Sequence, residues 1–444
     1  MKNLILFLIF LFGCECMAFD IVYPKRKDVT INAESTFFIG SSNKPLKING
    51  QEVPLHNSGG FAYVVTLNNG KNTFVVQDED KREIFVITKP VIKNVFSSPK
   101  FVEFDEIKYF YVINEASPLR STPINAGINR ISHLQQDILL KVDGEKNGFY
   151  RVILNSKTYA WIAKYDVKQC DEKFNSAKLN GYDFIQSPQY YTYIFHLNKR
   201  VPFEINEKFL IKFYDIEGNP DNTYTMDIQQ KFPVLGYNSG YDGNDFVLNI
   251  RKPLNINSKK PLKNIKIALD AGHGGSEKGA VGCLGHLEKD ITLSITKYLE
   301  IELKNRGAKV FLTRDDDIYV GLKDRVEKSN KQDTVVLLSI HGNALPDGYD
   351  PNQISGTSIY YYYEQAKPLA DILLETMVSE LGLCDDKVRQ GSLALVRNTN
   401  ALSLLKEVAY LINPVDNAKL INENFQKECA KAIADGLEKY FSRI

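Results

Sequence analysis

The chain lacks the features that mark nucleic-acid-binding, membrane-spanning and zinc-knuckle proteins. Its 444 residues carry 55 Lys and Arg against 54 Asp and Glu, so a broad basic surface for nucleic acid is not expected. It has only six cysteines and no CxxC pair, which argues against a structural zinc knuckle. Beyond the N-terminus the cysteines are scattered, at Cys170, Cys283, Cys384 and Cys429. We expect them to be buried thiols, and a single disulfide stays open for an oxidising compartment.

The longest apolar run at the N-terminus, Leu4–Phe12, is too short to cross a bilayer as a helix. Lys2 precedes it, and small residues follow it, as in a secretory signal peptide. Residues 1–18 are therefore expected to be a signal, which two processing routes fit. Cleavage after residue 18 would leave Phe19 first, whereas lipidation would use Cys14, because "LFGC" resembles a bacterial lipobox. Either route places the protein outside the cytoplasm, in the periplasm or cell envelope, lipid-anchored or secreted.

A helical period is also missing from the first ~250 residues, which alternate in short strand-like segments between turn signals. Residues 20–92 contain predicted strands at Asp28–Asn32 and Thr36–Gly40. Asn49-Gly50 and Asn69-Gly70 are predicted to be hairpin turns. The pattern "INGQEVPL…GGFAYVVTLNNGKNTFVV" resembles small immunoglobulin-like sandwiches of secreted bacterial proteins.

Residues 100–168 form a second predicted β module. Its segments "SPLRST", "GFYRV" and "YAWIA" resemble those of bacterial SH3-like barrels, a resemblance that implies contact with cell-wall peptide or with an activator protein. The alternative is a spacer barrel with Trp161, the only tryptophan, in its core. Residues 170–252 are Tyr-rich and predicted to be a third β module of unassigned role, and residues 253–262 a linker.

Strands and helices alternate in residues 263–442. The strands are predicted at 264–270, 309–313, 335–339, 357–363 and 403–411, and the helices at 291–305, 369–381 and 424–441. In the first helix Ile291, Ile295, Leu299 and Leu303 recur every fourth residue. This alternation predicts an α/β domain with a mostly parallel sheet flanked by helices. The predicted architecture is therefore multidomain, with all-β modules followed by a C-terminal α/β domain.

Four residues of this domain carry the types needed for metal chemistry, and three of them lie near element ends. His273 follows the first strand, Glu288 precedes the first helix, His341 ends a strand and Glu407 lies in an otherwise apolar strand. Because ligands gather at the carboxyl ends of strands in open α/β sheets, distant residues can converge there.

Two histidines and a carboxylate suit a zinc site with three protein ligands and a fourth position for water. Glu407 suits a second role. An unpaired carboxylate is costly to bury, so a metal, cation or substrate is expected nearby, and a carboxylate outside the metal ligands is useful for proton transfer.

Residues 264–442 resemble the zinc-dependent N-acetylmuramoyl-L-alanine amidases of bacteria. The matching segments are "IALDAGHGGSEKGAVG", "LEKDITLSI", "AKVFLTRDDDIYVGLKDRV", "LLSIHGNA", "GTSIYYYY" and "LLKEVAYLINPVDNAKL". The resemblance implies that His273, Glu288 and His341 bind Zn²⁺ and that Glu407 is the catalytic carboxylate. It also implies the bond cut in peptidoglycan, the amide between N-acetylmuramic acid and L-alanine.

The departures from the family pattern leave these four residues intact. Ala271 stands in place of a usual Pro, and Leu402 in place of another. Asn343 and Arg389 are candidates for substrate contact, and for Arg389 a surface role is an equal alternative. His286, two residues before Glu288, has no counterpart in the family's metal set. Some members of the family carry a long helix after the second histidine that blocks the catalytic site. Here the corresponding segment, residues 344–355, is short and is predicted to be a loop that leaves the site open.

The predicted function is therefore peptidoglycan amide hydrolysis in wall remodelling or cell separation. Two alternatives remain open at this point: a zinc endopeptidase of the wall, or a non-catalytic wall-binding protein. The four intact residues weigh against the second, whereas the three β modules favour some binding role. Peptidoglycan is the expected partner.

Overall fold

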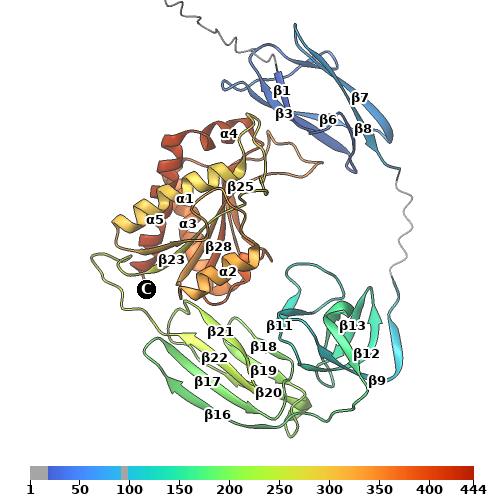
Figure 1. Ribbon diagram of the computed structural model, residues 1–444, viewed down its shortest axis with the longest axis vertical. Helices are drawn as coiled ribbons and strands as arrows, with labels where there is room; N and C mark the ends of the chain where they lie inside the picture. The colour runs from blue at the N-terminus through green and yellow to red at the C-terminus, as the bar shows by residue number, and fades with distance from the viewer. Residues whose placement is uncertain (1–18, 92–98) are drawn as a thin grey trace, which may run out of the picture.

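The computed structural model describes residues 19–91 and 99–444, in which three β-rich modules surround a C-terminal α/β domain (Figure 1). The expected signal peptide, residues 1–18 with Cys14, lies outside the described residues. Among the helices described, none combines the length and apolar character needed to cross a membrane. All four cysteines of the described part are unpaired; Cys283 and Cys429 are buried, whereas Cys384 is exposed.

The first module packs two sheets, β1-β3-β6 and β2-β8-β7-β4-β5, around a core rich in Phe, Ile and Val. Its strands are β1 (Phe19–Tyr23), β2 (Asp28–Thr30), β3 (Ser35–Ser42), β4 (Lys47–Ile48), β5 (Gln51–Glu52), β6 (Gly60–Thr66), β7 (Gly70–Gln77) and β8 (Arg82–Lys89). Asn49 and Gly50 both have positive φ and connect the paired strands β4 and β5, which confirms that hairpin. The second predicted hairpin, at Asn69-Gly70, is wrong, because β6 pairs with β3 and β7 with β8, in different sheets. The turn signal there marks a crossing between sheets.

The second and third modules share one hydrophobic core. The second is a seven-stranded antiparallel sheet, ordered β11-β10-β14-β13-β12-β9-β15. Its strands are β9 (Val102–Val112), β10 (Ser117–Arg120), β11 (Arg130–Leu134), β12 (Leu139–Lys146), β13 (Phe149–Ile153), β14 (Tyr159–Ala163) and β15 (Val167–Cys170). Trp161 is only half-buried, while its neighbours Ala160 and Ile162 are fully buried, so the alternative that puts Trp161 in the core is wrong. The alternation of the strand points the indole to the outer face, against Phe101.

The third module consists of the sheets β16-β17-β22-β21 and β18-β19-β20. Its strands are β16 (Leu179–Gln186), β17 (Tyr190–Leu197), β18 (Phe203–Ile205), β19 (Leu210–Tyr214), β20 (Thr223–Asp227), β21 (Tyr237–Asp242) and β22 (Asp245–Arg251). Lys141 of the second module pairs with Asp215 of the third at 2.7 Å. Because the two modules share buried side chains as well as this ion pair, they pack as one body.

The C-terminal domain is built on a six-stranded sheet ordered β24-β23-β25-β28-β26-β27. The strands are β23 (Lys266–Ala271), β24 (Lys309–Leu312), β25 (Val336–Asn343), β26 (Thr357–Tyr361), β27 (Asp385–Gln390) and β28 (Leu402–Tyr410). Four of the five strand pairings are parallel, and β26 runs antiparallel to β28. The carboxyl ends of β23, β25 and β28 therefore meet at one edge of the sheet.

Helices cover both faces of this sheet. The five helices of the described part are α1 (Glu288–Asn305), α2 (Leu322–Lys331), α3 (Lys367–Leu381), α4 (Pro414–Leu420) and α5 (Glu423–Phe441). In α1 the predicted stripe of Ile291, Ile295, Leu299 and Leu303 is buried, and it packs into the same core as α3 and α5. The predictions missed α2, α4 and β27. Helix α2 and the edge strand β27 are mostly charged, "LKDRVEKSNK" and "DDKVRQ", so neither has an apolar period to detect.

The first module contacts the loop of residues 344–355, which follows β25 (Figure 1). The Tyr23 hydroxyl donates to both carboxylate oxygens of Asp347 at 2.9 Å, and the Thr36 hydroxyl donates to one of them at 2.5 Å. Burial, and then the bond to Asp347, raise the pKa of Tyr23 to about 12. The Gly348 N–H donates to the Ser35 carbonyl at 2.9 Å. These bonds hold the loop on the surface of the module.

Tyr23→Phe should loosen this loop. The substitution removes one donor from a half-buried carboxylate, at a cost of about 1 kcal/mol. Hydrogen–deuterium exchange of residues 344–355 should then quicken about fivefold, while exchange elsewhere in the C-terminal domain stays as in the parent. The matched control is Tyr63→Phe, which removes a hydroxyl that binds Gln51 inside the first module. Equal exchange of the loop in both variants would show that the Asp347 contact does not hold it.

Candidate metal centre

His273 lies in a strained turn immediately after β23. It has φ of 60°, in the left-handed region that residues other than glycine rarely adopt. Gly272, just before it, has no room for a side chain, because a Cβ there would lie 2.4 Å from Cε1 of His341. The turn therefore brings the backbone of one strand end directly against the imidazole of the next strand. Tertiary contacts must hold a turn of this kind.

Two buried arginines hold that turn. Arg314 Nε donates to the Ala271 carbonyl and Arg314 Nη2 to the Gly272 carbonyl, both at 2.9 Å. Arg325 Nη2 donates to the His273 carbonyl at 2.7 Å. Both arginines lie in "TRDDDIYVGLKDRV", a segment that resembles the family but for which the sequence suggested no role.

A buried carboxylate balances the charge of Arg325. Asp270, the residue before the end of β23, pairs with Arg325 Nη1 at 2.7 Å, and both side chains are almost completely buried. The Ser339 hydroxyl donates to the other oxygen of Asp270 at 2.5 Å, and the Thr313 hydroxyl also binds the carboxylate. The carboxylate thereby joins β23, β25 and α2 beneath the histidine turn. Sequence alone could not find this role, since Asp270 differs from an ordinary strand-end aspartate only in its tertiary contacts.

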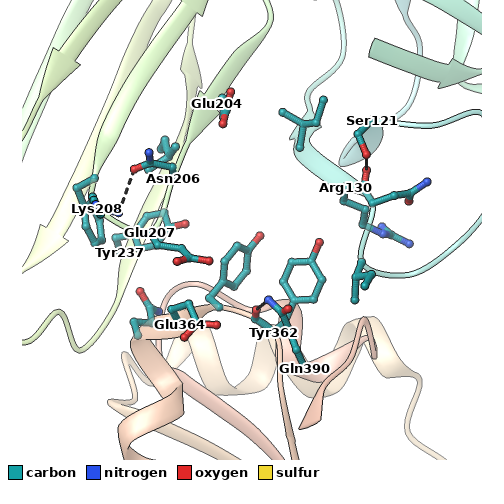
Figure 2. Close-up of a pocket in the computed structure, with 17 residues that line it drawn as sticks. Ser121, Arg130, Glu204, Asn206, Glu207, Lys208, Tyr237, Tyr362, Glu364 and Gln390 are labelled. Atoms are coloured by element: carbon teal, nitrogen blue, oxygen red, sulfur yellow. Dashed lines mark hydrogen bonds between the residues drawn. The ribbon is translucent and has the colours of Figure 1, made fainter. Parts of the chain in front are cut away.

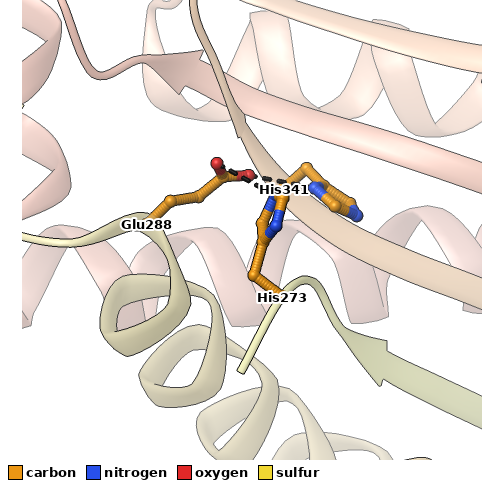
Figure 3. A group of neighbouring side chains, drawn as sticks. All are labelled: His273, Glu288 and His341. Atoms are coloured by element: carbon orange, nitrogen blue, oxygen red, sulfur yellow. Dashed lines mark hydrogen bonds and ion pairs between the residues drawn. The ribbon is translucent and has the colours of Figure 1, made fainter. Parts of the chain in front are cut away.

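Glu288 begins α1, and its carboxylate points toward both histidines (Figure 3). Its Oε2 is 3.1 Å from His273 Nε2, and its Oε1 is 2.9 Å from His341 Nδ1. The backbone N–H groups of Ala280 and Gly342 donate to the same two oxygens at 2.8 and 3.1 Å. Burial alone would raise the pKa of Glu288, but the hydrogen bonds with the two histidines outweigh it and lower the pKa to about 2. The carboxylate is therefore ionised at neutral pH.

The structure brings His273, Glu288 and His341 together, as expected from the sequence. One ligand atom of each lies within 4.8 Å of the others, a spacing that could hold a metal ion. The side chains of His273 and His341 are 29% and 17% exposed, so the cluster opens toward solvent on the histidine side. Two imidazoles and one carboxylate around an open position match a catalytic zinc site more closely than a closed structural one.

Glu407 lies on β28 directly opposite His341 of β25. Its Oε2 is buried and has no hydrogen-bond partner in the described part of the chain. Burial raises the pKa of Glu407 to about 7, while the charge of His341 opposes this rise and that of Glu288 adds to it. A buried carboxyl group without a partner is costly, and here it faces the histidine cluster.

The other residues considered for substrate or metal contact lie at different distances from this centre. Asn343 ends β25, the strand of His341, and its side chain accepts the Ala344 N–H at 2.8 Å. Arg389 lies on the edge strand β27, two strands away from Glu407, and pairs with Asp386. Tyr360 lies on the strand between them. Burial raises the pKa of Tyr360, the charge of Arg389 lowers it and the charge of Glu407 raises it. His286 is exposed and lies outside the three-residue cluster.

Arg325→Met should strongly destabilise the C-terminal domain. It would leave Asp270 buried without its cation, at a cost of roughly 3–5 kcal/mol in the free energy of unfolding. Chemical denaturation followed by circular dichroism measures the change. Lys323→Met on the same helix is the matched control, because its side chain is 87% exposed and should shift the free energy by no more than about 0.5 kcal/mol. Equal stability of the two variants would contradict the role given to the Asp270–Arg325 pair.

Comparison with known proteins shows which family the C-terminal domain resembles. Residues 267–439 match the family model of N-acetylmuramoyl-L-alanine amidases. Over 190 residues the chain is 36% identical to the probable cell wall amidase LytH of Staphylococcus aureus, covering 42% of this chain and 62% of that protein. The chain thus spans less than two thirds of the length of the curated relatives that it matches.

Solved structures of amidases also align with about 40% of the chain. Amidase AmiC2 of Nostoc punctiforme is 32% identical with a TM-score of 0.38, and the alignment covers 40% of this chain and 96% of that one. The catalytic domain of CwlV from Bacillus (Paenibacillus) polymyxa is 34% identical with a TM-score of 0.38, over 40% of this chain and 97% of that one. The family model and the sequence identity to LytH point the same way: residues 267–439 of this chain are similar to the N-acetylmuramoyl-L-alanine amidases.

Proposed function

We propose that the C-terminal domain hydrolyses the amide bond between N-acetylmuramic acid and L-alanine in peptidoglycan, with a bound Zn²⁺. The observation that carries the proposal is the convergence of His273, Glu288 and His341, with the unpartnered carboxyl of Glu407 opposite His341. The family match supports the type of bond that is cut.

His273, Glu288 and His341 would hold the metal. Their donor set of two imidazoles and one ionised carboxylate suits Zn²⁺ in composition and leaves a position open for water. A bound zinc ion would lower the pKa of that water and polarise the scissile carbonyl. Glu288 is held in place by two backbone N–H groups, which fix its carboxylate beside both histidine rings.

Glu407 would move the proton. With a pKa raised to about 7, its carboxyl group can accept a proton from the attacking water and release it to the leaving nitrogen of alanine near neutral pH. Lys406, its neighbour, faces the other side of the sheet, where its ammonium binds the Thr357 hydroxyl and a backbone carbonyl. The alternation of β28 thus separates the lysine from the carboxyl group.

Asn343 and Arg389 are proposed substrate contacts. Asn343 lies two residues after His341, at the strand end that borders the cluster. Arg389 lies on the edge of the same sheet, where its guanidinium and Tyr360 border the approach to Glu407. An arginine at this edge suits a carboxylate of the stem peptide.

The rest of the chain fits a protein of the cell envelope. A signal peptide at residues 1–18, with or without lipidation at Cys14, would deliver it outside the cytoplasm. We further propose that the first module is immunoglobulin-like and that the second is SH3-like and takes part in wall or activator contacts. The loop of residues 344–355 contacts the first module instead of containing a blocking helix, so the catalytic site should work without a displacement step.

The test is digestion of purified peptidoglycan followed by mass spectrometry of the soluble fragments. The protein should release stem peptides that begin with alanine, and a chelator should abolish the release until Zn²⁺ is restored. Glu407→Gln should lower the rate about 10²- to 10⁴-fold, since it removes the proton carrier. The variant should still bind one zinc ion, as measured by atomic absorption.

The pattern of fragments separates the alternatives. Peptides cut between two amino acids would identify an endopeptidase. Zinc bound at the cluster without any released fragment would identify a wall-binding protein or the lack of an activator. Glu423→Gln, a change of the same type on the surface of α5, is the matched control and should leave the rate unchanged.

A further inference from the structure

Two adjoining cavities lie where the second module, the third module and the C-terminal domain meet, away from the metal centre. The larger has a volume of about 560 Å³ and the smaller about 370 Å³. They share lining residues from all three parts, namely Arg130, Ile131, Ile205, Tyr237 and Tyr363. Their combined size is in the range of small-ligand sites and suits a short peptide.

Three guanidinium groups near this joint, of which Arg130 and Arg397 line the cavities, have no hydrogen bond to a carboxylate in the part of the chain described. Arg120 donates only to Asn125, Ala126 and Asn129. Arg397 donates only to Ser392. Arg130 contacts only His133, at 2.9 Å. Burial and the charge of Arg130 both lower the pKa of Arg397, so the cluster carries unbalanced positive charge.

His133 adds to this cluster as a neutral acceptor. Burial, and then the charges of Arg130, Arg397 and Arg120, lower its pKa to about 4. At neutral pH the Arg130 guanidinium therefore donates to Nε2 of His133. This contact orients Arg130 but leaves its charge uncompensated.

Three buried polar atoms of the smaller cavity's lining residues have no hydrogen-bond partner among the described residues. They are Arg130 Nε, Ser132 Oγ and Asn398 Nδ2. All three groups can donate a hydrogen bond. These three atoms are covered by neighbouring atoms, so a ligand in the cavity would meet the guanidinium groups of Arg130 and Arg397, to which two carboxylate oxygens offer several acceptor positions.

The opposite side of the larger cavity is acidic. Figure 2 shows Arg130 on one side of it, with Glu207, Glu364 and Lys208 on the other, where the two glutamates outnumber the lysine. Glu364 accepts a hydrogen bond from the Tyr361 hydroxyl at 3.1 Å. Burial, then this bond, and then the charges of Glu364, Asp371 and Glu207 raise the pKa of Tyr361 to about 12. No cation pairs with either of these glutamates within the described ranges. Such a wall attracts an ammonium group and repels a polyanion such as a nucleotide or polyphosphate.

We propose that the joint cavity binds a short peptide, with its carboxylate at Arg130 and Arg397 and an ammonium group at Glu207 and Glu364. The site is separate from the metal centre. Asn398 precedes β28, and Leu402 and Glu407 are five residues apart along that strand, about 17 Å at the rise of a β-strand. The cavity stands on its own contacts, and only the identification of the ligand with the wall stem peptide rests on the proposed function.

Isothermal titration calorimetry with L-alanyl-γ-D-glutamyl-L-lysine tests the site. The peptide should bind the wild-type protein, and the same peptide with both carboxylates amidated should bind about 10- to 100-fold more weakly. A third form, acetylated on both amino groups, should also bind at least about fivefold more weakly. Arg130→Gln and Arg397→Gln should each weaken the parent peptide about 10- to 100-fold. Arg82→Gln, in strand β8 of the first module, is the matched control and should bind as the wild type does.

Each opposite outcome overturns the proposal. If the acid and the amide bind equally, the peptide carboxylates make no contact in the site. If Arg130→Gln and Arg397→Gln bind the parent peptide as tightly as the wild type does, the peptide binds elsewhere. No heat from any peptide at millimolar concentration would also end it. The comparison of acid with amide is also made in Arg389→Gln protein, so that a carboxylate contact at the proposed catalytic site does not contribute to the difference. Calorimetric binding needs no hydrolysis of peptidoglycan, so this readout is separate from failure of the proposed amidase reaction.

Discussion

The parallel register of β25 between β23 and β28 is the constraint on which the centre depends. This register sets His341 opposite Glu407 on one side and places the end of β25 beside the end of β23 on the other. With strands about 4.8 Å apart, the side chains at these ends meet without any long loop to position them. Glu288 completes the cluster because α1 packs across the same sheet and starts at its carboxyl edge.

Buried charged side chains beneath the candidate metal centre hold its geometry, although removing them from water costs free energy. The Asp270–Arg325 pair and Arg314 are removed from water, and each must be fully hydrogen-bonded to be tolerated. Their donors bind the carbonyls of residues 271–273, which keeps His273 in a left-handed conformation that the backbone alone disfavours. His273, one of the proposed metal ligands, thus lies on a turn that is stable only inside the assembled domain.

The β modules contact the C-terminal domain at two opposite ends (Figure 1). The first module holds the loop that follows β25, through Asp347 and the apolar contacts of Cys283 and Ile412. The second and third modules share one core and meet the domain around Tyr237 and Tyr363, where the cationic and acidic sides of the joint cavity face one another. The modules therefore do more than space the domain from the N-terminus: one holds the loop after β25, and two enclose a separate polar site.

The sequence by itself determined the α/β domain, its amphipathic helix α1 and the residues His273, Glu288 and His341. A strong apolar period and a histidine or glutamate at a strand end are local signals, and they can be recognised in the sequence without knowledge of the fold. The sequence did not reveal α2 or β27, because both are mostly charged. Helix α2 packs on the domain through the buried Arg325, and β27 is an edge strand that pairs with a single neighbour. Only the tertiary structure decided the partner of Asp270, the crossing at Asn69-Gly70 and the arginine cluster around Arg130. These depend on contacts between residues far apart in the chain, and the free energy of burying a charge depends on what surrounds it, not on its neighbours in sequence.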